Sequence, residues 1–391
     1  MLQQTHRGYR QRVAHLTLKA TLYGSWALGL FPFTYDSRTR QLTRSRWLLS
    51  YGLVLNLGLM GLSLLPEPEP HEETKVEVYH RNPVVKQVEG LVEMISMVST
   101  CVMHLRIFWK SKEMATILNE LLLLKERHFR HPILGHCHQF DNYVIQKFCT
   151  VLLEVASSLL IYYGVPDTNV VIAKAFCVYL ALLGVLLGIT HFHLAVIYIY
   201  RFVWTINGEL LELANQQRRG QRADTAQIQL LLRLYSRLLE LNSRLAAIYD
   251  IQVTLFMVTL MSANIMIAHV LIIFWNNQHM FSLLDIAMIF PQALIINFYD
   301  LWLSIAFCDL AERTGRQTSA ILKLYNDGEQ MDEELQRSLS DFALFCSHRR
   351  LRFRHCGLFY VNYEMGFRMI ITNILYLVFL VQFDYMNLQY K

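Results

Sequence analysis

The sequence predicts an all-α membrane protein with seven transmembrane helices, a cytoplasmic N-terminus, an extracellular C-terminus and a cytoplasmic helical layer. Of its 391 residues, 54% are hydrophobic and only 17% are charged, which lies outside the usual range of soluble domains. The apolar residues gather into seven stretches close to the roughly 20 residues that a helix needs to cross a bilayer. The basic residues gather in alternate connections between these stretches, as is typical of multi-pass membrane proteins.

The seven predicted spans differ in length and regularity. The fourth would be about 46 Å long as a helix, so we expect its end to project into water or the helix to tilt. Pro291 predicts a kink in the sixth. The spans are residues 47–65, 88–109, 148–165, 170–200, 251–275, 283–307 and 365–383.

The distribution of lysine and arginine predicts the orientation. The N-terminal segment and the loops 110–147, 201–250 and 308–364 hold 29 of these residues, whereas the other loops and the C-terminal tail hold 4. Positive charge stays on the cytoplasmic side of a membrane, so these four segments are predicted to lie inside the cell. The first fifteen residues are polar and basic, and no secretory signal is expected there.

These assignments divide the chain into seven parts. An apolar piece from Leu16 to Phe33, with basic residues on both sides, is predicted to lie at the membrane interface or against the bundle. The parts are a cytoplasmic N-terminal segment with that interfacial helix (1–46), spans one to four (47–200), a cytoplasmic helical anchor segment (201–250), spans five and six (251–307), a second anchor segment (308–364), a pore-lining span (365–384) and an extracellular tail (385–391).

The last span carries a recognisable pattern. It contains Thr372, Asn373 and Gln382, and because polar groups facing lipid are costly, we expect them to face protein or water. Residues 376–383 read Tyr-Leu-Val-Phe-Leu-Val-Gln-Phe. This stretch resembles the C-terminal signature of insect gustatory receptors, which is Thr-Tyr, five hydrophobic residues and Gln-Phe; here Leu375 stands in place of the threonine. Chain length, span count and orientation resemble that family too.

The resemblance implies a function. The family consists of tastant-gated non-selective cation channels, homo- or heterotetramers of gustatory receptor subunits in the plasma membrane of gustatory sensory neurons, with the last span lining the pore. The Gly29–Phe33 piece, GLFPF, is similar to receptors of the bitter-sensing subset. The implied pore residues are Tyr376, Phe379 and Gln382.

Two of these residues have a physical interpretation within a pore. Phe379 and Gln382 are three residues apart and lie on nearly one helix face. Phe379 would form a hydrophobic constriction that closes by dewetting, and Gln382 a polar ring above it. Alternatively, Gln382 hydrogen-bonds a neighbouring helix.

Aromatic and polar residues in the outer halves of spans two to six predict a pocket for a small, partly apolar ligand. The alternative is an aromatic belt at the level of the lipid headgroups. The candidates are Tyr179, His269, Tyr162, Phe176, Phe290, Gln292 and Glu93.

The segment before the fifth span has an apolar heptad seam. Its spacing of three and four residues predicts a helix that packs either between subunits or within one subunit. The seam consists of Leu231, Leu234, Leu238, Leu241, Leu245 and Ile248.

Two acidic residues fall in predicted inner halves of spans, Glu154 and Asp300. Unpaired charges are expensive in lipid, and Arg106 is predicted to pair with one of them. A proton relay is the alternative, and it would favour a transporter.

The remaining sequence features predict no metal, cofactor or enzymatic activity. Four histidines and Cys137 crowd residues 128–138, but their spacing matches no zinc finger and indicates a solvated surface. The basic run His348–His355 suits anionic lipid headgroups, not nucleic acid. No catalytic motif occurs in a plausible context. A secondary transporter lacks support from inverted repeats, and a G-protein-coupled receptor would require the reversed topology.

Overall fold

A computed structural model describes residues 8–63, 83–129, 137–164, 172–219, 224–276, 283–325 and 333–389. The elements are α1 (Tyr9–Ala27), β1 (Phe33–Asp36), β2 (Gln41–Arg44), α2 (Arg46–Ser63), α4 (Pro83–Trp109), α5 (Ser111–Arg127), α6 (His138–Gly164), α7 (Ile172–Arg218), α8 (Thr225–Asn276), α9 (Leu283–Lys323), α10 (Glu333–His348), β3 (Arg354–His355), β4 (Phe359–Tyr360) and α11 (Tyr363–Gln389).

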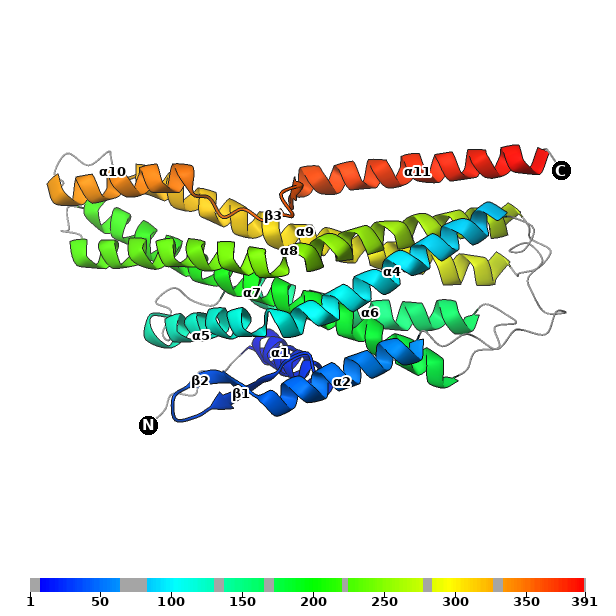
Figure 1. Cartoon of the computed structure of the whole chain (residues 1–391). Helices are drawn as coiled ribbons and strands as arrows, with labels where there is room; N and C mark the ends of the chain where they lie inside the picture. The colour runs from blue at the N-terminus through cyan, green and yellow to red at the C-terminus, as the bar shows by residue number, and fades with distance from the viewer. Residues whose placement is uncertain are drawn as a thin grey trace.

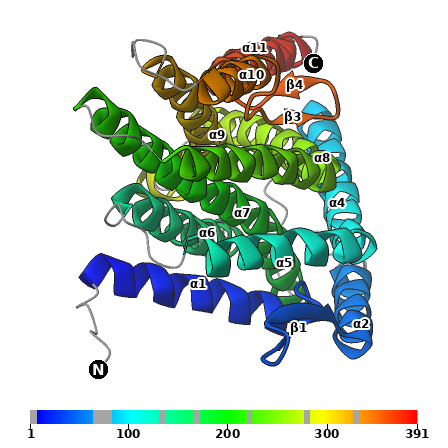
Figure 2. The same ribbon diagram turned by 90° about the vertical axis from the view of Figure 1, so that its left-hand side faces the viewer.

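The long helices form one elongated bundle around α7. This helix packs against α2, α6, α8 and α9, and its apolar residues occur on all sides, which suits a central position. Figure 1 shows α5 and α10 at one end of the long axis and the C-terminus at the other. We call these the loop-helix end and the opposite end. In both views α1 and α11 lie on opposite sides of the bundle (Figures 1 and 2).

The predicted spans all fall on helices of this bundle, namely α2, α4, α6, α7, α8, α9 and α11. Among the described residues, six helices are long and apolar enough to cross a membrane, and α2 contains a shorter apolar stretch, Arg46–Leu62. The helices α7, α8 and α9 continue well beyond the predicted spans toward the loop-helix end, where they form the expected helical layer. Pro291 lies inside an uninterrupted α9.

The heptad seam packs within one chain. All six residues from Leu231 to Ile248 are buried in the single chain, where α8 contacts α7 and α9. In α10, Leu339 and Cys346 are also buried, and Phe342 packs edge-on against Tyr235 of α8 at a ring distance of 5.7 Å. Of the two alternatives for the seam, packing within one subunit is therefore the one that this burial supports, because neighbouring helices of the same chain cover it.

The N-terminal helix packs against the bundle, as one of the two alternatives predicted. It contacts α6 and α7 through small and polar side chains, Ala14, Thr17, Thr21 and Ser25. Several of its large apolar side chains, including Leu16 and Trp26, are exposed. An outward apolar face on a bundle-bound helix suits contact with a membrane interface.

A close glycine contact fixes the corner between α1 and α2. Gly29 has a φ of +68°, which favours glycine, and a Cβ there would lie 2.3 Å from the Cα of Gly52. The Tyr51 hydroxyl donates to the Ala27 carbonyl, and the Asn56 amide donates to the Leu28 carbonyl. The Gly29–Phe33 piece is thereby held as the structured link from α1 to β1.

Two short hairpins add to the expected helices. Asn119 of α5 accepts from the Leu42 N–H and donates to the Leu42 carbonyl, which fastens the β1–β2 hairpin to α5. The β3–β4 hairpin precedes α11 and is fastened to α8, because the Asp250 carboxylate accepts the Cys356 N–H. Burial lowers the pKa of His355 in β3 to about 4, and the nearby Asp250 opposes that shift.

Candidate functional site

The last helix, α11, leaves most of its apolar surface uncovered. Only its first part is closely packed: a Cβ on Gly366 would come within 2.6 Å of the Ile305 side chain of α9. The Tyr363 ring contacts Trp302 and the Arg313 guanidinium, with centroid distances of 4.8 and 5.3 Å. Over the apolar window of α11, just 11% of residues are buried. This side of the chain is therefore open to lipid, to another subunit or to water.

The predicted pore residues all lie on this open part of α11. Tyr376 is 58% exposed, Phe379 is 59% exposed and Gln382 is also exposed. The Phe379 ring stacks on that of Phe383 at a centroid distance of 6.0 Å. A glutamine facing lipid would be costly, so this position needs water or another protein surface.

Asn373 lies on the inward side of the same helix. It is buried, and its amide atoms have no hydrogen-bond partner among the described residues. The Thr372 hydroxyl donates to the Arg368 carbonyl of its own helix. Of the three polar residues noted in the last span, Gln382 is therefore the one whose side chain lies on the exposed face of α11.

The predicted ligand residues lie on five helices, in segments near the opposite end of the bundle (Figure 1). Phe290 and His269 are buried, and Tyr179 and Gln292 are half-buried. The Tyr179 hydroxyl donates to the Ser158 carbonyl and so joins α7 to α6. These four side chains face the bundle.

The other three ligand candidates have less support from their positions. Phe176 is 63% exposed and Glu93 is also exposed in the single chain. The side chain of Tyr162 lies outside the described residues. The predicted pocket as a whole therefore stays a prediction.

The buried acidic residues have a different partner from the predicted one. The Lys147 ammonium of α6 lies 2.6 Å from the Asp300 carboxylate of α9, and both side chains are almost fully buried. Arg106 instead donates to the carbonyls of Ile248 and Ala247. The prediction failed because α6 begins at His138, ten residues before the predicted span, so Lys147 belongs to the helix and not to a loop.

Glu154 lies beside this ion pair. Asp300 and Lys147 are its electrostatic neighbours. Lys147 and Glu154 are seven residues apart and share a face of α6, and this spacing could have revealed the lysine from sequence. The buried Lys147–Asp300 ion pair favours a role in stabilising the bundle over a role in a proton relay.

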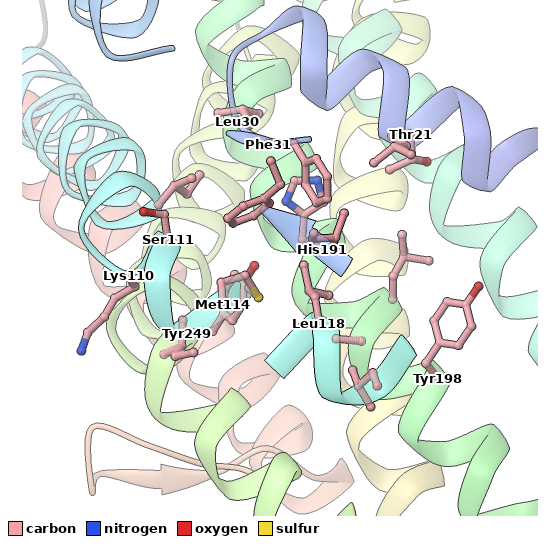
Figure 3. A pocket seen from close by; sticks show the side chains of 18 of the residues that line it. Thr21, Leu30, Phe31, Lys110, Ser111, Met114, Leu118, His191, Tyr198 and Tyr249 are labelled. Carbon is pink, nitrogen blue, oxygen red and sulfur yellow. The ribbon is translucent and has the colours of Figure 1, made fainter. Parts of the chain in front are cut away.

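One well-formed cavity lies nearer the loop-helix end, between α1, the Gly29–Phe33 piece, the α4–α5 junction, α7 and α8 (Figure 3). We call it the α1 cavity. None of the predicted pore or ligand residues lines it. No group of three metal-ligating side chains occurs within the described ranges, and His131 and His136 of the histidine-rich stretch lie outside them.

Comparison with known proteins defines the family. Residues 18–387 match the family model described as 7tm chemosensory receptor. A Drosophila melanogaster protein designated gustatory receptor 22a is 62% identical over 97% of this chain and 96% of its own length. The gustatory receptor for bitter taste 22e of the same species is 49% identical over 99% of this chain and 100% of its own.

Solved structures show the same fold at low sequence identity. The insect olfactory receptor OR5 from Machilis hrabei has a TM-score of 0.61 and 11% identity, with 96% of this chain and 100% of that chain covered. The same receptor in complex with eugenol has the same TM-score and identity, with 95% and 99% covered. This protein therefore shares the helical fold of that receptor, and it belongs to the insect gustatory receptor family of multi-pass membrane chemoreceptors, whose members are not enzymes.

Proposed function

We propose that this gustatory receptor is a subunit of a tastant-gated non-selective cation channel for bitter compounds. It would act in the plasma membrane of gustatory sensory neurons as a homo- or heterotetramer with other gustatory receptor subunits. The bitter assignment is supported by the relative named as a receptor for bitter taste. The channel assignment is carried by one observation, the long exposed face of α11 with Gln382 on it.

The proposed pore is made of the exposed faces of α11 from several subunits. Phe379 forms the hydrophobic constriction, Gln382 a polar ring beside it, and Tyr376 continues the same wall. Assembly around a shared axis would place Gln382 against water instead of lipid, and would cover the large apolar side chains of this helix.

The proposed orientation places the loop-helix end in the cytoplasm. This proposal is supported by the described parts of the four lysine- and arginine-rich segments, which lie in the half of the long axis toward that end (Figure 1). The outward apolar face of α1 would then lie on the inner membrane surface, together with anionic lipid at the basic run His348–His355. Epitope tags at both termini test this: an extracellular N-terminus would support a G-protein-coupled receptor instead.

The proposed tastant site is at the opposite end, around the four inward-facing candidates Tyr179, His269, Phe290 and Gln292. Apolar walls with few polar groups suit a small organic molecule. The related fold has been solved in complex with eugenol. If Tyr179→Ala and His269→Ala both leave the dose–response curve unchanged, this placement is wrong.

Patch-clamp recording in a cell line tests the channel directly. The cells express this chain alone or with a second gustatory receptor, intracellular GTP is removed, and a panel of bitter compounds is applied. We expect a ligand-evoked cation current that survives without GTP. A current that is lost when GTP is removed would favour a receptor coupled to G proteins. Ligand uptake that Glu154→Gln abolishes would favour a transporter. Either result would contradict the channel.

A further inference from the structure

The α1 cavity has about the size of a small-molecule site. Its volume is about 290 Å³. Ligand pockets start at roughly 300 Å³, and a dry apolar cavity of about 150 Å³ already binds benzene. The α1 cavity therefore has room for a molecule larger than one aromatic ring, such as a bicyclic one.

The cavity wall is mainly apolar. Phe31 faces it from the Gly29–Phe33 piece, and Met114 and Leu118 face it from α5 (Figure 3). Three cations lie at its edge. Lys110 pairs with Glu113, and Arg106 donates to two backbone carbonyls. Lys125 also has a partner within the chain. Figure 3 also shows the Lys110 side chain directed away from the cavity. These features favour an apolar occupant over an anionic headgroup.

Several polar groups of the wall are satisfied by the protein itself. The Thr21 hydroxyl donates to the Thr17 carbonyl, and the Ser111 hydroxyl donates to the Phe108 carbonyl. The Gln252 amide donates to the Met103 carbonyl. These groups therefore contribute little recognition of their own.

His191 of α7 is different, because only one of its ring nitrogens has a partner within the described part of the chain. Nε2 lies 2.7 Å from the Ser25 hydroxyl of α1, and that hydroxyl donates its single proton to the Thr21 carbonyl, also at 2.7 Å. The hydroxyl must then accept from Nε2–H. In the neutral ring, which apolar surroundings favour, Nδ1 is left as a hydrogen-bond acceptor. The ring lies at the cavity wall, next to Phe31 (Figure 3).

We propose that the α1 cavity is a second small-molecule site, which binds a mainly apolar compound carrying one hydrogen-bond donor, such as a phenol. The donor binds Nδ1 of His191, and the apolar part fills the space between Phe31 and Leu118. The occupant would tie α1 and the Gly29–Phe33 piece to α5 and α7. The site lies apart from the tastant candidates and does not depend on the proposed channel activity.

Binding of matched probes to the purified full-length chain in nanodiscs tests this site. The probes are radiolabelled 1-naphthol, whose hydroxyl can donate a hydrogen bond, and 1-methoxynaphthalene, in which a methyl group replaces that proton. Empty nanodiscs give the lipid background. We expect 1-naphthol to bind about two- to tenfold more tightly, the range of one net hydrogen bond. His191→Phe should remove this preference and leave 1-methoxynaphthalene binding unchanged.

A pair of substitutions on α5 tests the location. Leu118→Trp fills the cavity and should abolish binding of both probes, whereas Leu123→Trp, on the exposed side of the same helix, should leave it unchanged. Equal binding of the two probes to the unaltered chain, or binding that survives Leu118→Trp, would overturn the proposal. Native mass spectrometry gives a further test. A bound phospholipid that Leu118→Trp removes and that 1-naphthol does not displace would also overturn the proposal, because the cavity would then hold a lipid tail.

Discussion

The helices α7 and α11 are both apolar enough to cross a membrane, yet they have opposite surroundings. In its most apolar window, α7 has 67% of its residues buried, whereas α11 has 11%. In the described part of the chain α7 is contacted by α1, α2, α4, α6, α8 and α9, while α11 is packed mainly at its first residues. Hydropathy therefore indicates that a helix can span, but burial shows which helix still lacks its final neighbours. On this comparison α7 stabilises the chain itself, and α11 is the helix that the proposed assembly would cover.

The largest expected effect is at the ion pair in the buried part of the bundle. Lys147→Met leaves the Asp300 carboxylate unpaired, and we expect the free energy of unfolding to fall by about 3–5 kcal/mol. Thermal unfolding of the detergent-solubilised protein, followed by size-exclusion fluorescence, measures this. The double variant Lys147→Met/Asp300→Leu should recover most of the loss. If the double variant is as unstable as the single one, the charge is not the cause.

A smaller loss is expected at the corner between α1 and α2. A Cβ on Gly52 would lie 2.2 Å from the Gly29 carbonyl oxygen, so Gly52→Ala must displace backbone and should cost about 1–3 kcal/mol. Gly58→Ala is the matched control, because nothing lies within 4 Å of a Cβ there and alanine favours a helix. Similar melting temperatures for the two variants would contradict the close contact.

The hairpin before α11 predicts a pH dependence. The pKa of His355 falls from 6.5 to about 4 on folding, so the unfolded chain binds the proton more tightly. The stability that this group contributes is complete above pH 6.5 and is lost as the pH falls toward 4. At pH 5.5 the loss is about 1 kcal/mol. Thermal unfolding at pH 7.5 and 5.5 should show a larger difference for the unaltered chain than for His355→Phe.

The smallest effect is expected at an exposed ion pair of α11. Glu364 and Arg368 lie 2.6 Å apart but are largely exposed, so Arg368→Met should change the free energy of unfolding by less than about 0.5 kcal/mol. The same thermal measurement applies. A loss comparable to that of Lys147→Met would mean that the start of α11 is as tightly integrated as the bundle core, which would weaken the contrast with α7.

The sequence was sufficient for features that depend on a local pattern. Apolar length located seven helices, of which six are long and apolar enough to cross a membrane within the described residues. The heptad period located the buried face of α8 from Leu231 to Ile248. It was insufficient where the result depends on packing between distant elements. Lys147 was assigned to a loop because the charge at the start of α6 ended the apolar run, although Asp300 compensates it 153 residues later.

The α1 cavity is the clearest case of information that the sequence does not contain. Its wall combines Phe31, Leu118 and His191, which belong to three elements with no common motif. The close approach of Gly29 to Gly52 is equally invisible, because each glycine taken alone suits helix packing or a turn. The exposed face of α11 is intermediate: its residues were named from a family pattern, and its exposure became visible only with the fold.

The most direct test of the central claim, that the open face of α11 lines a cation pore, is the resting current of two matched variants. Phe379 and Phe367 are both exposed phenylalanines of α11, at 59% and 63%. Whole-cell recording at equal surface expression compares Phe379→Ala with Phe367→Ala in the absence of tastant. We predict a ligand-independent cation current with Phe379→Ala alone, because the constriction is removed. Resting conductance that is unchanged in both variants, or raised equally in both, would contradict a pore closed by Phe379.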